Sequence, residues 1–374
     1  MSAPSIPNLL TLRGGARRGR GRGGTARGGH APGTTAGARH DLTIQGTDND
    51  AAQSRLSAVQ LGYLQDPFAQ LFSPPAPRRQ PIINRGTYIR TTAITKIVTH
   101  FLQSTANQPK RKQIISLGAG TDTRALHLLT AHNDEPIVYH EIDFPTICRR
   151  KEHLFRNSPE IARCFEIEQP LPSNSNSPVD PTGPPPVGAP DTTVTWRARD
   201  RRHKPNTIHC HGLDLRTLTP QSELLPGVDP TVPTLLISEC CLCYLSPPEA
   251  SNVLAHFSTR IQNIGIVIYE PIKPGDPFGQ MMVSNLAARG IRMPTLEVYK
   301  QPEDQEERLR AAGFREVRQM TVDRIWDKWV DEDEKERVEG LEWLDEVEEW
   351  KLLSGHYIVA WGWTGAGLEL PDRA

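Results

Sequence analysis

Short apolar runs, separated by glycine, proline or polar segments, recur along most of this 374-residue chain. Apolar runs of about four to eight residues are typical of strands, and apolar residues every three or four positions are typical of helices. The expected strands cover residues 113–117, 137–143, 207–215, 233–239, 265–270 and 356–363. The expected helices cover residues 48–64, 89–101, 246–261 and 303–312. Because strands and helices alternate, the pattern predicts an α/β fold with a mostly parallel, doubly wound sheet that binds its ligand at the carboxyl ends of the strands.

The first strand leads into a glycine turn within residues 113–124, QIISLGAGTDTR. Gly118 and Gly120 allow the backbone to turn sharply and a ligand to approach it closely. Residues 121–123 are Thr-Asp-Thr, and each of them is a suitable N-cap for the helix expected next. A strand, a glycine turn and a helix together form the first half of a doubly wound nucleotide site.

The residues around this turn narrow the type of nucleotide. A dinucleotide fingerprint requires a third glycine where Thr123 stands, and the Gly-Lys-Ser/Thr of a phosphate-binding P-loop is absent. The second strand ends at Asp143, where an acid can hold both ribose hydroxyls. Asp214 and Glu239 end the next two strands and point to the same edge. These features favour a nucleoside ligand without phosphates, such as S-adenosylmethionine; an ordinary strand–helix turn is the alternative.

Several cations lie in the N-terminal part of the chain. Asp48 or Asn49 is a suitable cap for the first expected helix, and Arg55 lies beside the apolar stripe of that helix. Arg85 and Arg90 lie near the expected start of the next helix, where the helix dipole disfavours positive charge. Their position suggests that they bind an anion. A surface arginine paired with an acid is the alternative for either one.

Two segments are expected to lack regular structure. Residues 1–45 contain an Arg-Gly tract at 13–29, which has nothing to bury and could bind RNA weakly through phosphate contacts. Residues 169–206 are rich in proline and then basic, and proline at that density excludes regular structure. The remaining chain is expected to form one domain over residues 46–374, with a helical cap over 46–108.

The composition adds limits on location and metal binding. The formal net charge of −1 hides a basic N-terminal segment and an acidic stretch at 331–349, which we interpret as the solvated face of a helix. The six cysteines form no Cys-x-x-Cys pair and are expected to be buried free thiols. Strand alternation explains His209, Cys210 and His211 better than a metal cluster does, so no metal is predicted. With no apolar run long enough for a membrane span and no signal peptide, we expect a cytoplasmic protein, with the nucleus as a further location. No segment resembles a dimer seam, so we expect a monomer.

Several separate blocks resemble the leucine carboxyl methyltransferase family, whose enzymes methylate the C-terminal leucine of type-2A protein phosphatase catalytic subunits. The similarity runs from about residue 48 to residue 363. It rests on SRLSAVQLGYLQDPF, INRGTYIR, LGAGTDTR, EIDFP, GLDLR, LLISECCLCYLSP, YEPIKPGDPFGQMM and LEWLDE. The resemblance implies a class I, Rossmann-like, S-adenosylmethionine-dependent methyltransferase with an N-terminal helical cap and no metal.

The resemblance also implies roles for residues at matching positions. Gly118 is expected in the turn beside the cofactor, and Asp143 is expected to hold the ribose. Asp214 and Leu215 are expected to flank the adenine, and Glu239 is expected to face the methionine moiety.

Three further residues are expected to handle carboxylates or the substrate. Arg90 should neutralise a carboxylate, either that of the cofactor or that of the substrate leucine, and Tyr244 should contact the substrate terminus. Arg55 occupies a position that is associated with lysine in relatives, and it is expected to bind the carboxylate of the cofactor.

The expected chemistry needs no general base. A peptide C-terminus has a pKa of about 3.3–3.7, so at pH 7 it is an ionised nucleophile. In-line methyl transfer from a sulfonium to this carboxylate depends mainly on positioning and exclusion of water. Two alternatives remain open. One is a methyltransferase acting on another carboxylate or on an RNA-linked acceptor, which the basic tail would suit. The other is a cofactor-binding scaffold that has lost activity and works through its tail.

Overall fold

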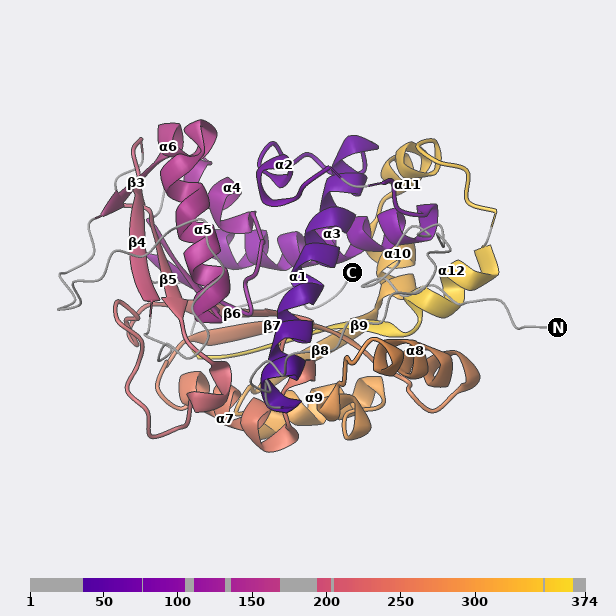
Figure 1. Cartoon of the computed structure of the whole chain (residues 1–374). Coiled ribbons are helices and arrows are strands. Elements are labelled where there is room, and N and C mark those ends of the chain that lie inside the picture. Colours follow the sequence, from indigo (N-terminus) through magenta and orange to yellow (C-terminus); the bar gives the residue numbers. More distant parts are fainter. Residues whose placement is uncertain are drawn as a thin grey trace, which may run out of the picture.

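A nine-stranded sheet forms the centre of the computed structural model, which describes residues 36–75, 77–104, 111–131, 136–168, 194–202, 205–345 and 347–365 (Figure 1). The strands are β1 (Lys112–Leu117), β2 (Ile137–Asp143), β3 (Phe165–Glu168), β4 (Val194–Asp200), β5 (Thr207–Gly212), β6 (Thr234–Glu239), β7 (Ile264–Pro271), β8 (Glu316–Thr321) and β9 (Tyr357–Thr364). Their order in the sheet is β3-β4-β5-β2-β1-β6-β7-β9-β8.

The middle of the sheet is parallel. β1 pairs in parallel with β2 on one side and β6 on the other, and this parallel part extends to β5 and β7. The pairings β3–β4, β4–β5, β7–β9 and β8–β9 are antiparallel. The strand order therefore reverses at β1, which is the place where doubly wound sheets bind ligands at their carboxyl edge. The fold class predicted from the alternating pattern is confirmed.

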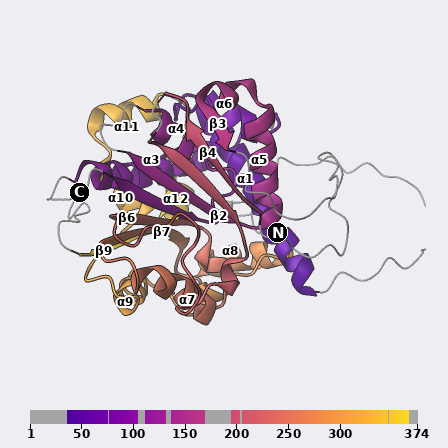
Figure 2. The ribbon, with the colours of Figure 1, turned by 90° about the vertical axis from the view of Figure 1, so that its left-hand side faces the viewer.

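Helices cover both faces of this sheet (Figures 1 and 2). The α-helices are α1 (Ala36–Gln60), α2 (Ala69–Phe72), α3 (Pro81–Gln103), α4 (Arg124–Thr130), α5 (Pro145–Asn157), α6 (Pro159–Cys164), α7 (Pro247–Ser258), α8 (Pro277–Ala288), α9 (Pro302–Ala311), α10 (Val322–Trp329), α11 (Glu332–Glu339) and α12 (Val347–Ser354). Short 3-10 turns cover Leu215–Thr217 (η1), Leu242–Tyr244 (η2) and Pro294–Glu297 (η3). In Figure 1, α3, α4 and α5 lie above the sheet, and α7, α8 and α9 lie below it.

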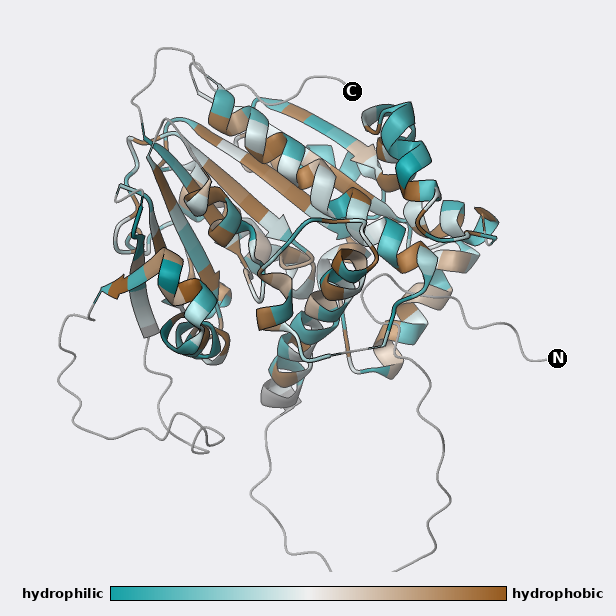
Figure 3. Ribbon diagram, turned by 90° about the horizontal axis from the view of Figure 1, so that it is seen from above, coloured by the Kyte–Doolittle hydropathy of each residue, from teal (hydrophilic) through white to brown (hydrophobic). Residues whose placement is uncertain are grey.

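Burial on both faces explains why the central strands are almost continuously apolar. On β1, Ile114 packs into the core on the α3 side, and Ile115 and Leu117 pack into the core on the α7 side. All six residues of β1 are buried. Figure 3 shows hydrophobic residues along much of several strands. Parallel strands covered by helices on both faces require this composition.

Three sequence-based boundaries are wrong. The first helix begins at Ala36 rather than near residue 48, so residues 36–45 are not part of a disordered tail and Asp48 is not its cap. Within the expected disordered segment 169–206, residues 194–200 form β4, which pairs with β3 and β5. Of these two predicted segments, residues 1–35, 169–193 and 203–204 lie outside the described residues.

The helix-dipole argument for the two arginines is also wrong. Helix α3 begins at Pro81, so Arg90 is the tenth residue of the helix and lies well beyond its first turn. Arg85 is buried, and its guanidinium lies 4.8 Å from the centre of the Trp326 ring and 5.9 Å from that of Trp350. Arg85 thus packs against aromatic rings, whereas Arg90 reaches the carboxyl edge of the sheet.

Local contacts and backbone geometry define the ends of two helices. Glu249 accepts hydrogen bonds from the backbone and hydroxyl of Ser246, which caps the start of α7. Gly313, with φ +98°, follows the end of α9. All six cysteines are free thiols as expected; five are buried and Cys164 is partly buried. Among the described residues, no helix is both long and apolar enough to cross a bilayer.

A buried ion pair joins α9 to the sheet and gives a stability prediction. Arg308 on α9 and Glu270 on β7 are 2.8 Å apart, and each side chain is only 2% exposed. We expect Arg308→Met to lower the free energy of unfolding by about 3–5 kcal/mol, because it leaves a buried carboxylate without a counter-charge. Denaturant unfolding followed by circular dichroism measures this loss.

Two matched variants test the cause. Arg310→Met removes an exposed arginine of the same helix, whose pair with Glu306 spans 3.7 Å, and it should cost less than about 1 kcal/mol. Adding Glu270→Gln to Arg308→Met should recover part of the loss. An equal loss for Arg308→Met and Arg310→Met would contradict the role of the buried pair.

Candidate functional site

One pocket at the carboxyl ends of β1, β2, β5 and β6 collects every site residue predicted from the sequence. Its lining includes Arg55, Arg90, Gly118, Asp143, Asp214, Leu215, Glu239 and Tyr244. The first half of α1 also lines it, from Asp41 to Ala51. Figure 1 shows α1 running across this edge of the sheet from the layer of α3 toward the layer of α8 and α9. The structure therefore brings the predicted residues together, while their individual roles stay predictions.

The turn after β1 requires glycine at both positions. Gly118 and Gly120 have φ values of +63° and +48°, which other residues rarely adopt. A Cβ on Gly118 would lie 2.6 Å from Sγ of Cys241, and one on Gly120 would lie 2.4 Å from Oδ1 of Asp48. The turn is thus closed on one side by the segment after β6 and on the other by α1.

Side chains from neighbouring elements hold this turn in place. Asp48 accepts hydrogen bonds from the backbone N–H and the hydroxyl of Thr121, at 2.6 and 2.8 Å. Lys151 on α5 donates to the carbonyl of Asp122 at 2.9 Å and pairs with Glu141 on β2 at 2.6 Å. The sequence analysis missed these contacts. Asp48 was interpreted as a helix cap, and Lys151 carried no local signal because its partners are on other elements.

Asp143 lies at the end of β2 as predicted and is fixed by the backbone. Its two carboxylate oxygens accept hydrogen bonds from the N–H groups of Gly120 and Phe144, each at 2.7 Å. Burial raises the pKa of Asp143 to about 6, and the nearby charge of Asp48 adds to the rise, while the two N–H groups oppose it. Each carboxylate oxygen retains acceptor capacity for a ligand hydroxyl.

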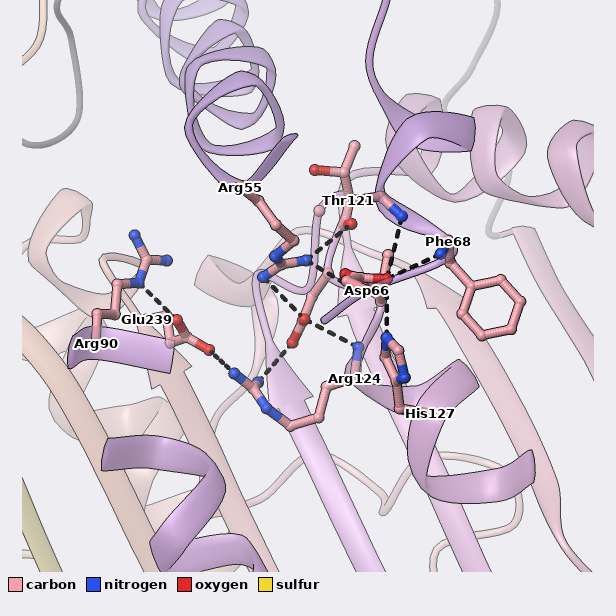
Figure 4. Close-up of polar contacts among 12 residues, drawn as sticks. Arg55, Asp66, Phe68, Arg90, Thr121, Arg124, His127 and Glu239 are labelled. Carbon is pink, nitrogen blue, oxygen red and sulfur yellow. Dashed lines mark hydrogen bonds and ion pairs between the residues drawn. The ribbon is translucent and has the colours of Figure 1, made fainter. Parts of the chain in front are cut away.

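A chain of alternating charges runs through the pocket floor (Figure 4). Glu239 at the end of β6 binds Nε of Arg90 at 2.7 Å and Arg124 at 2.8 Å. Arg124 also binds Asp122 at 2.6 Å, and Asp122 binds Arg55 at 3.1 Å. We call these five residues the charge ladder. It joins three helices, α1, α3 and α4, to the ends of β1 and β6.

The ladder fixes the ionisation of its acids. Burial alone would raise the pKa of Glu239, but the charges of Arg124 and Arg90 outweigh it and hold the pKa below its ordinary value. The same opposition operates at Asp122, whose pKa is lowered by Arg124 and Arg55. Both acids are therefore carboxylates at pH 7, with two arginines each.

The ladder carries one more positive than negative charge, since three arginines face two carboxylates. Arg90 contacts Glu239 through Nε, and its guanidinium carbon lies 5.0 Å from the centre of the Tyr269 ring. Within the described residues, its two terminal nitrogens make no hydrogen bond to the protein. Arg90 thus keeps both terminal nitrogens as donors for an anion in the pocket.

The residues expected to flank the adenine are arranged around Arg216. Asp214 follows β5, and both of its carboxylate oxygens accept hydrogen bonds from Arg216, at 2.6–2.9 Å. Arg216 also binds Asp41 of α1 at 2.8 Å. Leu215 is buried and supplies an apolar wall beside this pair. The start of α1 is therefore tied to the end of β5 by charge.

Tyr244 lies in η2, after a strained residue. Cys240 directly follows β6 and has φ +47°, a conformation that is uncommon for residues other than glycine and that occurs often at functional sites. Tyr244 is buried, and burial raises the pKa of its hydroxyl well above the ordinary value, so it remains a phenol. It can donate a hydrogen bond in the pocket but cannot serve as a base near pH 7.

Comparison with known proteins identifies the family. A sequence profile described as leucine carboxyl methyltransferase matches residues 43–258. Leucine carboxyl methyltransferase 1 from Aspergillus fumigatus is 46% identical in an alignment that covers 98% of this chain and 96% of that protein. This chain belongs to the leucine carboxyl methyltransferase family. It is therefore a methyltransferase by family, as its sequence blocks predicted.

Two more distant similarities complete the comparison for this methyltransferase. The tRNA wybutosine-synthesizing protein 4 of Rattus norvegicus is 34% identical over 85% of this chain, but the alignment covers 43% of that protein. The structure of magnesium protoporphyrin IX methyltransferase from Synechocystis with bound SAH covers 87% of this chain and 99% of its own, at 10% identity and a TM-score of 0.38. The second likeness is too low to bear on function.

Arg124 is the ladder residue that contacts both acids, and this leads to the first prediction for the site. We expect Arg124→Lys to weaken binding of S-adenosylhomocysteine at least tenfold, since one ammonium cannot replace a fork that binds Glu239 and Asp122 together. Calorimetry measures the affinity. Arg156→Lys, in an exposed pair on α5, is the matched control and should bind normally. Equal affinity in the two variants would show that ligand binding does not depend on the charge ladder.

Asp143 generates a pH prediction. A ligand hydroxyl that donates to its carboxylate favours the ionised form, so affinity for S-adenosylhomocysteine should fall as the pH drops through about 6. The fall cannot exceed tenfold per pH unit for one proton. Asp143→Asn should bind more weakly at pH 8 and should lose this slope between about pH 5 and 7, because its side chain does not titrate.

Calorimetry across that pH range provides the measurement. Glu152→Gln removes a partly exposed carboxylate from α5 and should retain the wild-type slope. If the affinity of Asp143→Asn still fell with pH over this range, the titrating group would be a residue other than Asp143.

Proposed function

We propose that this methyltransferase uses S-adenosylmethionine to convert the α-carboxylate of the C-terminal leucine of type-2A protein phosphatase catalytic subunits into a methyl ester. The observation that carries the proposal is a free arginine fork in a pocket whose acids are all engaged. Arg90 offers two terminal nitrogens, and Glu239, Asp122, Asp214 and Asp143 already have donors.

The pocket residues fit the proposed cofactor. The glycine turn leaves backbone without side chains at the end of β1, and Asp143 presents a carboxylate beside it for ribose hydroxyls. Leu215 offers an apolar surface for a base, and Glu239 offers a carboxylate for an ammonium group. When bound, S-adenosylmethionine supplies a methyl group on a positively charged sulfur. The protein holds its parts through residues from four different strands.

The two ladder acids and Tyr244 are unsuited to act as a base, which supports a carboxylate acceptor. An alcohol or amine would have to lose a proton to attack, and a positioned base would have to take it. Here Glu239 and Asp122 are held ionised between arginines, and Tyr244 remains a phenol. A peptide C-terminus is already ionised at pH 7 and needs no such group.

The role of Arg90 follows from the charge of the ladder. Its terminal nitrogens can bind a carboxylate through two parallel hydrogen bonds, which fixes the orientation of that group. The excess positive charge of the ladder favours an anion at this position. That anion is the carboxylate of the leucine or of the cofactor. Helix α1 covers the pocket and limits access of water to it.

An RNA-linked acceptor is the second candidate. A relative named as a tRNA wybutosine-synthesizing protein covers 85% of this chain, which favours that acceptor class as the alternative. Its identity of 34% is lower than the 46% of the leucine carboxyl methyltransferase, whose whole length is also matched. A leucine carboxylate is therefore the acceptor class that the comparisons favour over RNA.

Methyl transfer to defined acceptors tests the proposal. The full chain is incubated with labelled S-adenosylmethionine and either a type-2A phosphatase catalytic subunit, the same subunit without its terminal leucine, or bulk tRNA. We expect base-labile label on the intact subunit and none on the truncated one. Label on tRNA alone would favour the second candidate, and no label on any acceptor would favour the inactive scaffold.

The same assay with protein variants tests the role of the Arg90 guanidinium. Arg90→Lys should reduce transfer at least tenfold, because lysine can pair with Glu239 or hold a second carboxylate but cannot do both in a planar fork. Arg150→Lys, an exposed position on α5, should retain full activity. Deletion of residues 1–35 removes the Arg-Gly tract without entering α1 and should leave turnover unchanged. Full turnover in Arg90→Lys would reject the role of the fork.

A further inference from the structure

Three histidines meet on one face of the sheet, outside the methyl-transfer pocket. His140 lies on β2, and His209 and His211 lie on the adjacent parallel strand β5, where His209 is the register partner of His140. Residues 209 and 211 share a face because strand side chains alternate, and Cys210 points to the other side. The sequence placed only two of these histidines together, because His140 comes from a different strand.

The imidazole nitrogens of these residues are close together. One ligand nitrogen from each ring lies within 4.8 Å of the others, and Nδ1 of His140 is 3.0 Å from Nε2 of His211. The rings of His140 and His209 are stacked, with centres 4.7 Å apart. His140 and His211 are buried, and His209 is half-buried. The backbone of Gly227 closes the cluster, since a Cβ there would lie 2.8 Å from the His209 ring.

Two nitrogens in this cluster are buried without a partner. Nε2 of His140 and Nδ1 of His211 make no hydrogen bond within the described part of the chain. Neither atom takes part in the 3.0 Å contact between the two rings, so a metal at that contact would not bind them. Burial also lowers the pKa of all three histidines, and Arg111 and Arg197 contribute near His209. The rings are therefore neutral at pH 7, which leaves one lone pair on each.

We propose that His140, His209 and His211 form a binding site for a divalent transition metal of the Zn²⁺ class. Imidazole is the ligand that Zn²⁺, Co²⁺, Ni²⁺ and Cu²⁺ share, and three histidines leave a further position for water. At a Zn–N distance of about 2.0–2.1 Å, two ligand nitrogens cannot be more than about 4.2 Å apart. In a tetrahedral site the spacing is shorter, about 3.3–3.4 Å. The closest pair, at 3.0 Å, lies near this spacing, and the widest pair, within 4.8 Å, needs a shift of up to about 1.4 Å.

The metal would bind the lone pairs of Nδ1 of His140 and Nε2 of His211, and the proton now between these atoms would move to the other nitrogen of the ring that carries it. The bound ion would join β2 to β5. His140 lies three residues before Asp143, and His211 lies three residues before Asp214. The bound metal would therefore stabilise the pairing of β2 with β5, the two strands that lead to Asp143 and Asp214. Arg111 and Arg197 oppose the metal's charge, so binding should be weaker than at sites with acidic ligands.

Metal titration of the untagged full chain tests this proposal. After treatment with a chelator, the protein is titrated with Co²⁺ and its visible absorption is recorded, and calorimetry with Zn²⁺ gives the stoichiometry. We expect one ion per chain, with ligand-field bands and no thiolate charge-transfer band. Zn²⁺ should also raise the melting temperature, because it binds the folded state. No saturable binding, or a thiolate band, would overturn the proposal.

Histidine variants assign the ligands. His209→Gln is the first choice, because this residue is half-buried and its replacement disturbs the core least; binding should weaken at least tenfold. His211→Gln should do the same, and His153→Gln, an exposed position on α5, should bind like the wild type. If both cluster variants bind Co²⁺ as tightly as His153→Gln, the cluster is a hydrogen-bonded imidazole pair with a neighbour and the proposal fails.

Discussion

The buried charge ladder from Arg90 to Arg55 is the constraint on which the site depends. Its carboxylates could not remain ionised at this depth without arginines on both sides, and its arginines could not remain buried without the acids. The members come from α1, α3, the turn after β1, α4 and the end of β6. Removing one charge would leave its neighbours unpaired in a region of low dielectric. The ladder therefore couples the position of the N-terminal helices to the glycine turn.

Helix α1 is part of the site because polar contacts hold it along the carboxyl edge. Asp48 contacts the turn at Thr121, Arg55 contacts Asp122, and Asp41 contacts Arg216 beside Asp214. These contacts use the same backbone groups and acids that position the pocket. The packing of α1 and the formation of the pocket are consequently coupled. A substitution in α1 should therefore alter the pocket, and a substitution in the pocket should alter the packing of α1.

Local pattern was sufficient for much of the fold. The apolar runs of β1 and β6, the glycine turn, and acids at the ends of β2 and β6 are encoded within a few residues of each other, and the sequence predicted them correctly. The eight site residues expected from the family resemblance all line one pocket.

What the sequence missed depends on partners far away in the chain. Arg124 gained its role from Glu239, and Asp48 from Thr121, so neither could be assigned from its neighbours. The start of α1 was misplaced because polar and glycine residues in its first turns resemble a tail, and tertiary contacts such as Arg216–Asp41 hold them in the helix. β4 was missed because proline-rich sequence precedes it and its order comes from pairing with β5.

The charge of the pocket also indicates where catalysis must come from. In the proposed reaction, a sulfonium and a carboxylate lose their charges as the methyl group is transferred, so an arginine that binds the reacting carboxylate would stabilise the reactants more than the transition state. The fork of Arg90 is then useful only if orientation outweighs this cost. Its attachment to Glu239 at 2.7 Å, and that of Glu239 to Arg124 at 2.8 Å, restricts its movement. A fork held this firmly can align an anion without being pulled toward it, which is the property that positioning requires.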